Sequence, residues 1–173
     1  EPAPAADTAT DGTSATTDRP SQGAGPKLKR FRIAVTVGYQ YAHPFSYGML
    51  GLDVTVGIWG PIQAGLYVRP SYGGNKQFPG MPEVVGPVIF MPMGLAAGVR
   101  KEGWLSPYVN GAFQFAYNRD GLRALPFLVG AMVQGGLDIS PGDGFFVIRV
   151  QGEAGILGQV FNGRVSAGVG VRF

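Results

Sequence analysis

Two residues in the segment AHPFSYG have the types that acyl transfer requires. His43 is the single histidine of the chain, and Ser46 follows three positions later. A histidine can activate a nearby serine hydroxyl when a third group orients the imidazole. No carboxylate lies close to this pair in sequence, and the chain has no Gly-x-Ser-x-Gly elbow. We therefore rank an acyl-transfer enzyme behind non-enzymatic functions and expect no catalytic residue.

Metal, cofactor and nucleic-acid sites also lack their usual residues. One histidine and no cysteine cannot supply the ligand set of a typical zinc site. No P-loop and no complete Gly-x-Gly-x-x-Gly motif is present. The 14 Lys and Arg residues are scattered along the chain rather than clustered with stacking aromatics. The sequence therefore predicts no metal, no cofactor and no nucleic-acid partner.

Seven charged residues occur singly within segments in which polar and apolar residues alternate. They lie on the less apolar of the two faces that this alternation produces. They are Arg32, Asp53, Arg69, Asp138, Arg149, Glu153 and Arg172. A charge removed from water needs a partner, so we expect a plug of ion pairs and hydrogen bonds. Asp53 and Arg69 should be neighbours at similar height. The alternative is a narrow polar path or a small ligand pocket near the outer mouth.

The elements that position these charges follow a period of two. In RFRIAVTVGYQY, apolar residues occupy every second position from Phe31 to Tyr41, which is typical of a strand with one apolar face. A strand that crosses a bilayer obliquely needs about 9 to 11 residues. Eight suitable alternating segments occur, at residues 30–41, 50–58, 62–72, 87–99, 105–117, 127–139, 146–156 and 164–173.

The distribution of charge distinguishes a membrane barrel from a soluble one. Charged residues make up 14% of the chain, against roughly 25% in a typical soluble domain. The apolar faces are nearly free of charge, whereas the opposite faces carry mainly Gly, Ala, Ser, Thr and Gln. A soluble barrel would instead cover its outside with charged and polar residues. The sequence therefore predicts an all-β, eight-stranded antiparallel up-and-down transmembrane β-barrel over residues 30–173.

The connections are expected to alternate in length. Short, turn-rich pieces follow the second, fourth and sixth strands, at residues 59–61, 101–103 and 140–144. Longer pieces are expected at residues 42–47, 73–86, 118–125 and 157–163. Outer-membrane barrels have short periplasmic turns and long extracellular loops. We therefore expect both chain ends to be periplasmic.

Residues 1–29 differ from the rest of the chain in composition. They are rich in Ala, Thr, Pro, Asp and Ser, contain no aromatic residue, and include Leu28 as their single large aliphatic residue. Such a segment cannot bury enough apolar surface to offset the entropy lost on ordering. We expect a disordered tail or linker that precedes the barrel.

The C-terminal octet SAGVGVRF resembles the assembly signal of bacterial outer-membrane barrels. The matching residues are Ser166, Gly168, Val171 and Phe173. The resemblance implies recognition by the barrel-assembly machinery.

Residues 30–173 as a whole resemble the OmpA-like, OmpX-like and opacity-type small barrels. This wider resemblance implies the bacterial outer membrane, with the lipid bilayer and lipopolysaccharide as partners. A resemblance to the enzymes of this architecture, lipid A palmitoyltransferases and deacylases, would imply a histidine beside a serine.

Two non-enzymatic functions rank ahead of the enzyme. The first is a structural anchor or interaction module with its tail in the periplasm, possessing a periplasmic or surface protein partner. The second is a ligand-binding or small-solute transport barrel that uses the long extracellular loops. For that alternative, the candidate contacts to outer-leaflet phosphates are Lys76, Arg119, Arg123 and Arg164.

Three prolines conflict with the predicted strands. Pro70, Pro92 and Pro107 fall within the alternating segments, and a closed barrel offers no free edge for a residue without an N–H. Either the hydrogen-bonded strands are shorter than the alternation indicates, or bulges accommodate the prolines.

Overall fold

β-Strands account for nearly all of the described chain. The structure is a computed structural model that describes residues 31–42, 45–73, 88–119, 127–141 and 144–173. Its strands are β1 Phe31–Ala42, β2 Phe45–Trp59, β3 Ile62–Val68, β4 Ser71–Gly73, β5 Val88–Arg100, β6 Leu105–Arg119, β7 Phe127–Ile139, β8 Phe146–Leu157 and β9 Val160–Arg172. These residues include no helix that is long and apolar enough to cross a membrane. The predicted tail, residues 1–29, lies outside the described residues.

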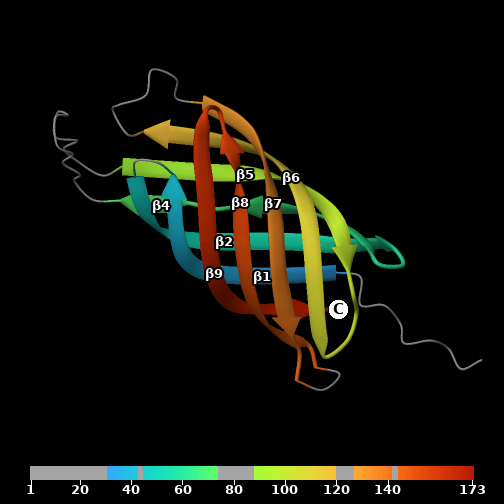
Figure 1. The fold of residues 1–173 in the computed structure, drawn as a ribbon. Helices are drawn as coiled ribbons and strands as arrows, with labels where there is room; N and C mark the ends of the chain where they lie inside the picture. Colours follow the sequence, from blue (N-terminus) through green and yellow to red (C-terminus); the bar gives the residue numbers. More distant parts are fainter. Residues whose placement is uncertain (1–30, 43–44, 74–87, 120–126, 142–143) are drawn as a thin grey trace, which may run out of the picture.

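The sheet closes on itself (Figure 1). Each strand pairs antiparallel with its neighbours, and β1 pairs with both β2 and β9. The N–H of Phe31 donates to the carbonyl of Phe173 at 2.9 Å, and the N–H of Phe173 donates back to Phe31 at 3.0 Å. Because β3 and β4 share the partners β2 and β5, they form one strand of the barrel. The predicted eight-stranded antiparallel barrel is confirmed.

The three prolines are accommodated without a change of register. Pro70 lies in the gap between β3 and β4, and its carbonyl accepts the N–H of Leu50 at 3.0 Å. Pro92 and Pro107 remain inside β5 and β6. Their carbonyls accept the N–H groups of Arg69 at 2.7 Å and Lys101 at 3.0 Å. Of the three prolines, Pro70 is therefore the one at which the hydrogen-bonded strand is interrupted. The irregularity recorded in the β2–β3 pairing lies between Gly57 and Trp59, away from all three prolines.

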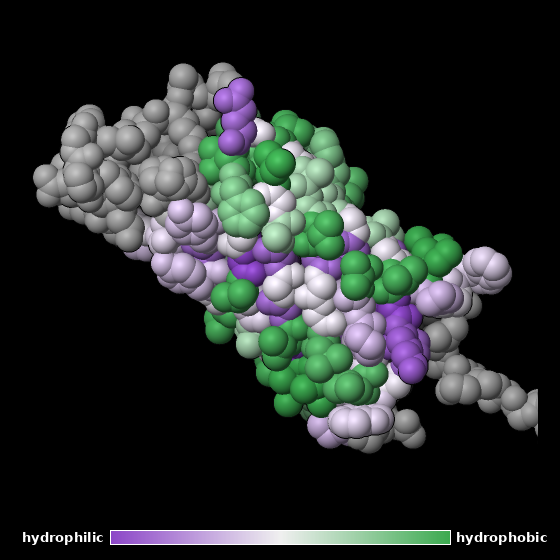
Figure 2. All heavy atoms as spheres, in the orientation of Figure 1, coloured by the Kyte–Doolittle hydropathy of each residue, from purple (hydrophilic) through white to green (hydrophobic). Residues whose placement is uncertain are grey.

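Inside and outside alternate along each strand as predicted. Polar residues such as Thr36 and Gln114 are fully buried in the interior, whereas apolar residues such as Val37 and Val133 are 63% and 59% exposed on the outside. Figure 2 shows hydrophobic residues exposed over much of one face of the molecule, interrupted by a band of paler and hydrophilic residues. This arrangement is the inverse of a soluble barrel, because the apolar face is the outer one.

The two rims differ in their connections. We define the turn rim as the end that holds residues 60–61, 101–104, 140–141 and 144–145 together with Phe173, and the loop rim as the opposite end. The expectation of four long connections at the loop rim is wrong for two of them. β1 and β2 remain paired up to Ala42 and Phe45, so their connection comprises residues 43–44. β8 and β9 are joined by Gly158 and Gln159, where Gly158 adopts a φ of 62°, a conformation that favours glycine.

Aromatic side chains are exposed near both rims. Trp59, Trp104 and Phe146 are 79%, 67% and 70% exposed at the turn rim, and Tyr72 is 63% exposed toward the loop rim. Aromatic residues at these two levels resemble the interfacial girdles of membrane barrels.

Candidate functional site

The interior of the barrel is the candidate site, because it holds the charged residues that the sequence singled out. Two tyrosines, Tyr67 on β3 and Tyr108 on β6, occupy its middle and are 2% and 4% exposed. Inward-facing glycines provide their space: a Cβ on Gly94 or Gly136 would lie 2.7 Å and 2.6 Å from the hydroxyl oxygens of Tyr67 and Tyr108. Large interior residues are therefore matched with glycines on adjacent strands.

A group of arginines surrounds Asp138 near the turn rim. We call Arg32, Arg100, Asp138 and Arg149 the turn-rim cluster. The Nε and Nη2 atoms of Arg149 donate to the two carboxylate oxygens of Asp138 at 2.8 Å and 2.9 Å. Arg100 Nη1 donates to Asp138 Oδ2, and Arg32 Nε lies 4.0 Å from the same oxygen. Arg32 also pairs with Glu102 at the rim. Asp138 is therefore shared by three guanidinium groups.

Tyr108 connects this cluster to the middle of the lumen. Its ring lies against two guanidinium groups, at 4.4 Å from Arg100 and 5.2 Å from Arg149. Its hydroxyl donates to Gln151 Oε1 at 2.6 Å. Cation–π contacts are strengthened when the cation is desolvated, so Tyr108 contributes both to filling the barrel and to stabilising the two arginines.

A second group of ion pairs lies closer to the loop rim. We call Asp53, Arg69, Glu153 and Arg164 the central cluster. Arg69 Nη2 donates to Asp53 Oδ1 at 2.6 Å and to Glu153 Oε1 at 2.9 Å. The other oxygen of Glu153 accepts Arg164 Nη1 at 2.7 Å. Arg164 Nη2 donates to Gln114 Oε1 at 2.7 Å. Asp53 and Arg69 are thus adjacent, as the sequence predicted.

Amide and hydroxyl groups continue the network above and below the ion pairs. Gln63 accepts Arg100 Nε at 2.6 Å and donates to Asn110 at 2.7 Å. Toward the loop rim, Gln40 donates to Asn162 at 3.2 Å and accepts the hydroxyl of Ser71 at 2.8 Å. These contacts connect strands that are adjacent or separated by one strand in the barrel.

Apolar side chains close the loop-rim end of the lumen. We call them the apolar cap: Ala42, Tyr47, Phe90, Ala116 and Leu157. Each is at most 1% exposed, and the rings of Tyr47 and Phe90 stack with centroids 5.5 Å apart. Its residues pair across the sheet with the polar residues Gln40, Ser71 and Asn162, so polar and apolar side chains meet at this end of the lumen.

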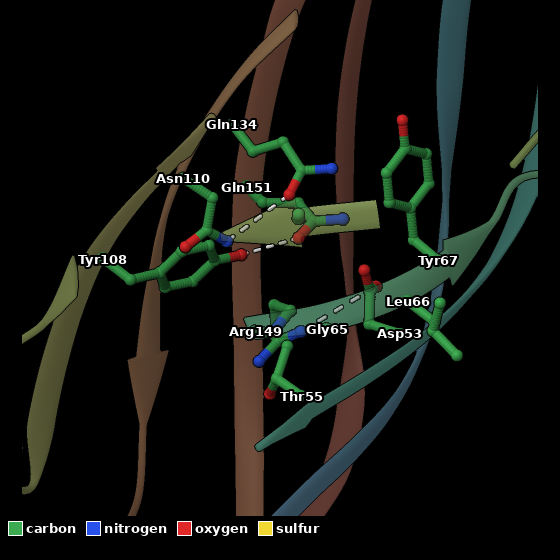
Figure 3. Close-up of a pocket in the computed structure, with 11 residues that line it drawn as sticks. Asp53, Thr55, Gly65, Leu66, Tyr67, Tyr108, Asn110, Gln134, Arg149 and Gln151 are labelled. Atoms are coloured by element: carbon green, nitrogen blue, oxygen red, sulfur yellow. Dashed lines mark hydrogen bonds and ion pairs between the residues drawn. The ribbon is translucent and has the colours of Figure 1, made fainter. Parts of the chain in front are cut away.

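The space left between these side chains is small. A cavity of about 10 Å³ lies among residues that include Asp53, Thr55, Tyr108, Gln134 and Arg149 (Figure 3). Figure 3 shows three interacting pairs around it: Tyr108 with Gln151, Asn110 with Gln134, and Arg149 with Asp53. A volume of about 10 to 15 Å³ on this measure holds about one water molecule. The cavity therefore suits a bridging water rather than an organic ligand.

The chemistry of the lumen is that of paired charges. The carboxylates of Asp53, Asp138 and Glu153 each accept hydrogen bonds from arginine. The geometry therefore supports a rigid, filled interior.

The structure places the seven predicted interior residues inside the barrel, and each is at most 7% exposed. Arg164 requires a correction: it was expected to contact outer-leaflet phosphates, but it is 3% exposed and lies in the central cluster. The reason is that β9 begins at Val160 and places Arg164 directly opposite Glu153.

The other candidates for phosphate contact fall at or beyond the limits of the described residues. Lys76 and Arg123 lie outside them, as does His43. Arg119 is the last residue of β6. Ser46 belongs to β2 and pairs with Tyr41 of β1.

Sequence reasoning missed Arg100, which is 3% exposed. The alternation along β5 predicts an inward side chain for Arg100, because Arg100 has the same parity as the inward positions Gly94 and Ala96. It also missed Gln40, Ser71 and Asn162 as one hydrogen-bonded group. Their association depends on strand register, which parity alone does not supply.

The four residues of the predicted assembly signal lie on β9 and at its end. Ser166 is buried on the inner face, and a Cβ on Gly168 would lie 2.0 Å from the carbonyl oxygen of Val35. Val171 pairs with Ile33. The ring of Phe173 stacks on Phe31 at 5.4 Å.

Comparison with known proteins shows the fold. No family model and no curated protein matches the sequence. Among solved structures, the N-terminal β-barrel domain of Pseudomonas aeruginosa OprF superposes with a TM-score of 0.59 and 11% identity, covering 82% of this chain and 97% of that one. Neisserial surface protein A gives 0.55 and 14%, covering 83% and 96%. Ail, the attachment invasion locus protein of Yersinia pestis, gives 0.53 and 14%, covering 83% and 97%. The chain therefore has the fold of small outer-membrane barrels.

Proposed function

We propose that this chain is a non-enzymatic barrel of a bacterial outer membrane that acts as an anchor or interaction module with a closed lumen. The observation that carries the proposal is the combination of an exposed apolar wall with an interior filled by paired charges. The wall suits contact with lipid. The filled interior leaves the rims and the N-terminal segment as the surfaces for partners.

The orientation and the partners belong to the same proposal. Turns that are short at one rim suggest a periplasmic turn rim, with both ends of the chain on the periplasmic side. Residues 1–29 would then extend into the periplasm, where a protein partner could bind them. The C-terminal strand would be read by the barrel-assembly machinery.

A test of the membrane barrel uses the full chain refolded in detergent. We expect a band that migrates differently before and after boiling, together with a β-type circular dichroism spectrum that requires amphiphile. A folded monomer in plain buffer would contradict the proposal.

Planar-bilayer recording tests the closed lumen. Because the ion pairs and the apolar cap fill the interior, we expect no steady conductance above that of the lipid. A stable open channel would instead favour transport of small solutes.

Protease treatment of intact cells tests the orientation: a tag at residue 1 should be protected until the outer membrane is permeabilised.

A second candidate is ligand binding by the long connections of the loop rim. Ail has been solved in complex with the heparin analogue sucrose octasulfate, and residues 74–87 and 120–126 of this chain include Lys76 and Arg123. Direct binding of a sulfated oligosaccharide, lost in a Lys76→Gln, Arg123→Gln variant, would support this candidate.

A further inference from the structure

The charges of the lumen do not balance. Among the described residues of the two clusters, five buried arginines face three buried carboxylates: Arg32, Arg69, Arg100, Arg149 and Arg164 against Asp53, Asp138 and Glu153. Arginine does not deprotonate in proteins, and an uncompensated charge in a low-dielectric interior is strongly unfavourable. The surplus therefore needs a negative partner.

The surplus lies at the turn-rim cluster. In the central cluster, two arginines meet two carboxylates. In the turn-rim cluster, Arg32, Arg100 and Arg149 share the carboxylate of Asp138, and Arg149 also lies 3.8 Å from Asp53 of the central cluster. Glu102 compensates Arg32 in part, but its side chain is 32% exposed at the rim. An additional anion would be stabilised most beside the arginines of this cluster.

Three hydrogen-bond donors in this region have no acceptor. Arg32 Nε, Arg100 Nη2 and Ser140 Oγ are buried and make no hydrogen bond within the described part of the chain. The side chains of Arg32 and Arg100 are 5% and 1% exposed, and Ser140 is fully buried. Guanidinium N–H groups can only donate, so their missing partner is an acceptor.

The three donors belong to residues at the turn-rim end of the lumen. Arg32 and Arg100 approach the same oxygen of Asp138 from β1 and β5. Ser140 follows Asp138 by two residues, which places both on the inner face of β7 and its extension. Arg32 Nε and Ser140 Oγ each carry one free hydrogen, and Arg100 Nη2 carries two. Donors from three separate residues suit a spherical anion better than a planar carboxylate, which prefers the two parallel N–H groups of one guanidinium.

We propose that the turn-rim cluster binds a small monovalent inorganic anion such as chloride, held by Arg32 Nε, Arg100 Nη2 and Ser140 Oγ. The anion offsets the surplus of positive charge and supplies the missing acceptor. The site is independent of the proposed role at the membrane, because it follows from the lumen charges alone.

The test is unfolding of the full chain in detergent at constant ionic strength, with sodium chloride progressively replacing sodium gluconate. A ligand that binds the native state stabilises it by mass action. Above the dissociation constant, we expect the unfolding equilibrium constant to fall by roughly tenfold for each tenfold rise in free chloride. An unfolding curve that is the same in chloride and gluconate would overturn the proposal.

Two matched variants separate a site from general screening. Arg100→Met removes one charge from the turn-rim cluster, and Arg164→Met removes the same charge from the central cluster. We expect Arg164→Met to keep the chloride dependence and Arg100→Met to lose it. Equal loss in both would indicate screening and contradict the site.

A milder variant tests the anion site if Arg100→Met does not fold. Ser140→Ala removes one donor without changing charge, and we expect it to need several times more chloride for the same stabilisation. An unchanged chloride dependence would count against the site. In crystals grown with sodium bromide, an anomalous peak among the three donor atoms is expected, and a peak elsewhere in the lumen would contradict the assignment.

Discussion

Within the lumen, the size of a single residue decides whether its neighbour fits. Gly136 lies beneath the ring of Tyr108, where an added Cβ would be 2.6 Å from the hydroxyl oxygen and 2.7 Å from the carbonyl oxygen of Val150. The adjacent Gly135 faces outward, and its Cβ would come no closer than 4.0 Å to the carbonyl oxygen of Tyr108. Two neighbouring glycines therefore have different roles, one for packing and one without a close contact.

We expect Gly136→Ala to lower the free energy of unfolding by about 1 to 3 kcal/mol, as overpacking of a filled core does. Gly135→Ala is the matched control and should remain within about 1 kcal/mol of the wild type. Equilibrium unfolding in urea with lipid vesicles measures both. Equal effects of the two substitutions would show that the Tyr108 contact is not the cause.

We expect the buried carboxylate of Glu153 to contribute more to the free energy of unfolding than the carboxylate of Glu102 at the rim. Glu153→Gln leaves Arg69 and Arg164 without their shared partner and should cost about 3 to 5 kcal/mol of unfolding free energy. Glu102→Gln removes a pair at the partly exposed rim and should cost less than about 1 kcal/mol. The same urea experiment compares them, and a reversed order would refute the importance of burial here.

Parity along the strands was sufficient to place most interior charges, but it did not determine their partners. The alternation placed Asp53, Arg69 and Glu153 inside because each is flanked by apolar neighbours. Which arginine meets which carboxylate depends on register and on the curvature that brings β3 near β8 across the lumen. Arg164 was misplaced because the start of β9 was not recognised.

At the scale of elements, β9 is the strand that completes the cylinder. It pairs with β8 and β1 along its length, and its last aromatic ring lies between Phe31 at 5.4 Å and Phe145 at 5.8 Å. The strand therefore combines a structural role with the predicted role of an assembly signal.

These two roles can be separated by substitution. Phe173→Ala keeps the backbone hydrogen bonds to Phe31 but removes the terminal aromatic ring. We expect the amount of folded barrel in cells to fall several-fold, while refolding of the purified chain into detergent is retained. Phe145→Ala removes a ring of the same stack and should leave cellular assembly near the wild-type level. A similar fall for both would indicate a purely structural effect.

The ends of the strands were less predictable than their centres. The alternation in the middle of β6, β7 and β8 marked apolar outward residues, and those strands were placed within two residues of their observed ends. Near the loop rim the interior is itself apolar, as the inward positions Tyr47 and Leu157 show. The contrast between faces disappears there, so the start of β2 was interpreted as a loop.

For the whole molecule, the cost of a charge on the outer wall should depend on depth. Val133 lies at the middle of β7 and Phe146 at the turn rim, and they are 59% and 70% exposed. In lipid vesicles, Val133→Arg should cost about 2 to 4 kcal/mol and Phe146→Arg at most about 1 kcal/mol. In a soluble protein both would be nearly neutral. Equal, small effects would therefore contradict the transmembrane assignment.

The closure of the sheet also sets an order in time. Because β1 finds one of its two partners in β9, the sheet can close only after its last strand has been synthesised. Until then, one edge of β1 lacks its native hydrogen-bond partner.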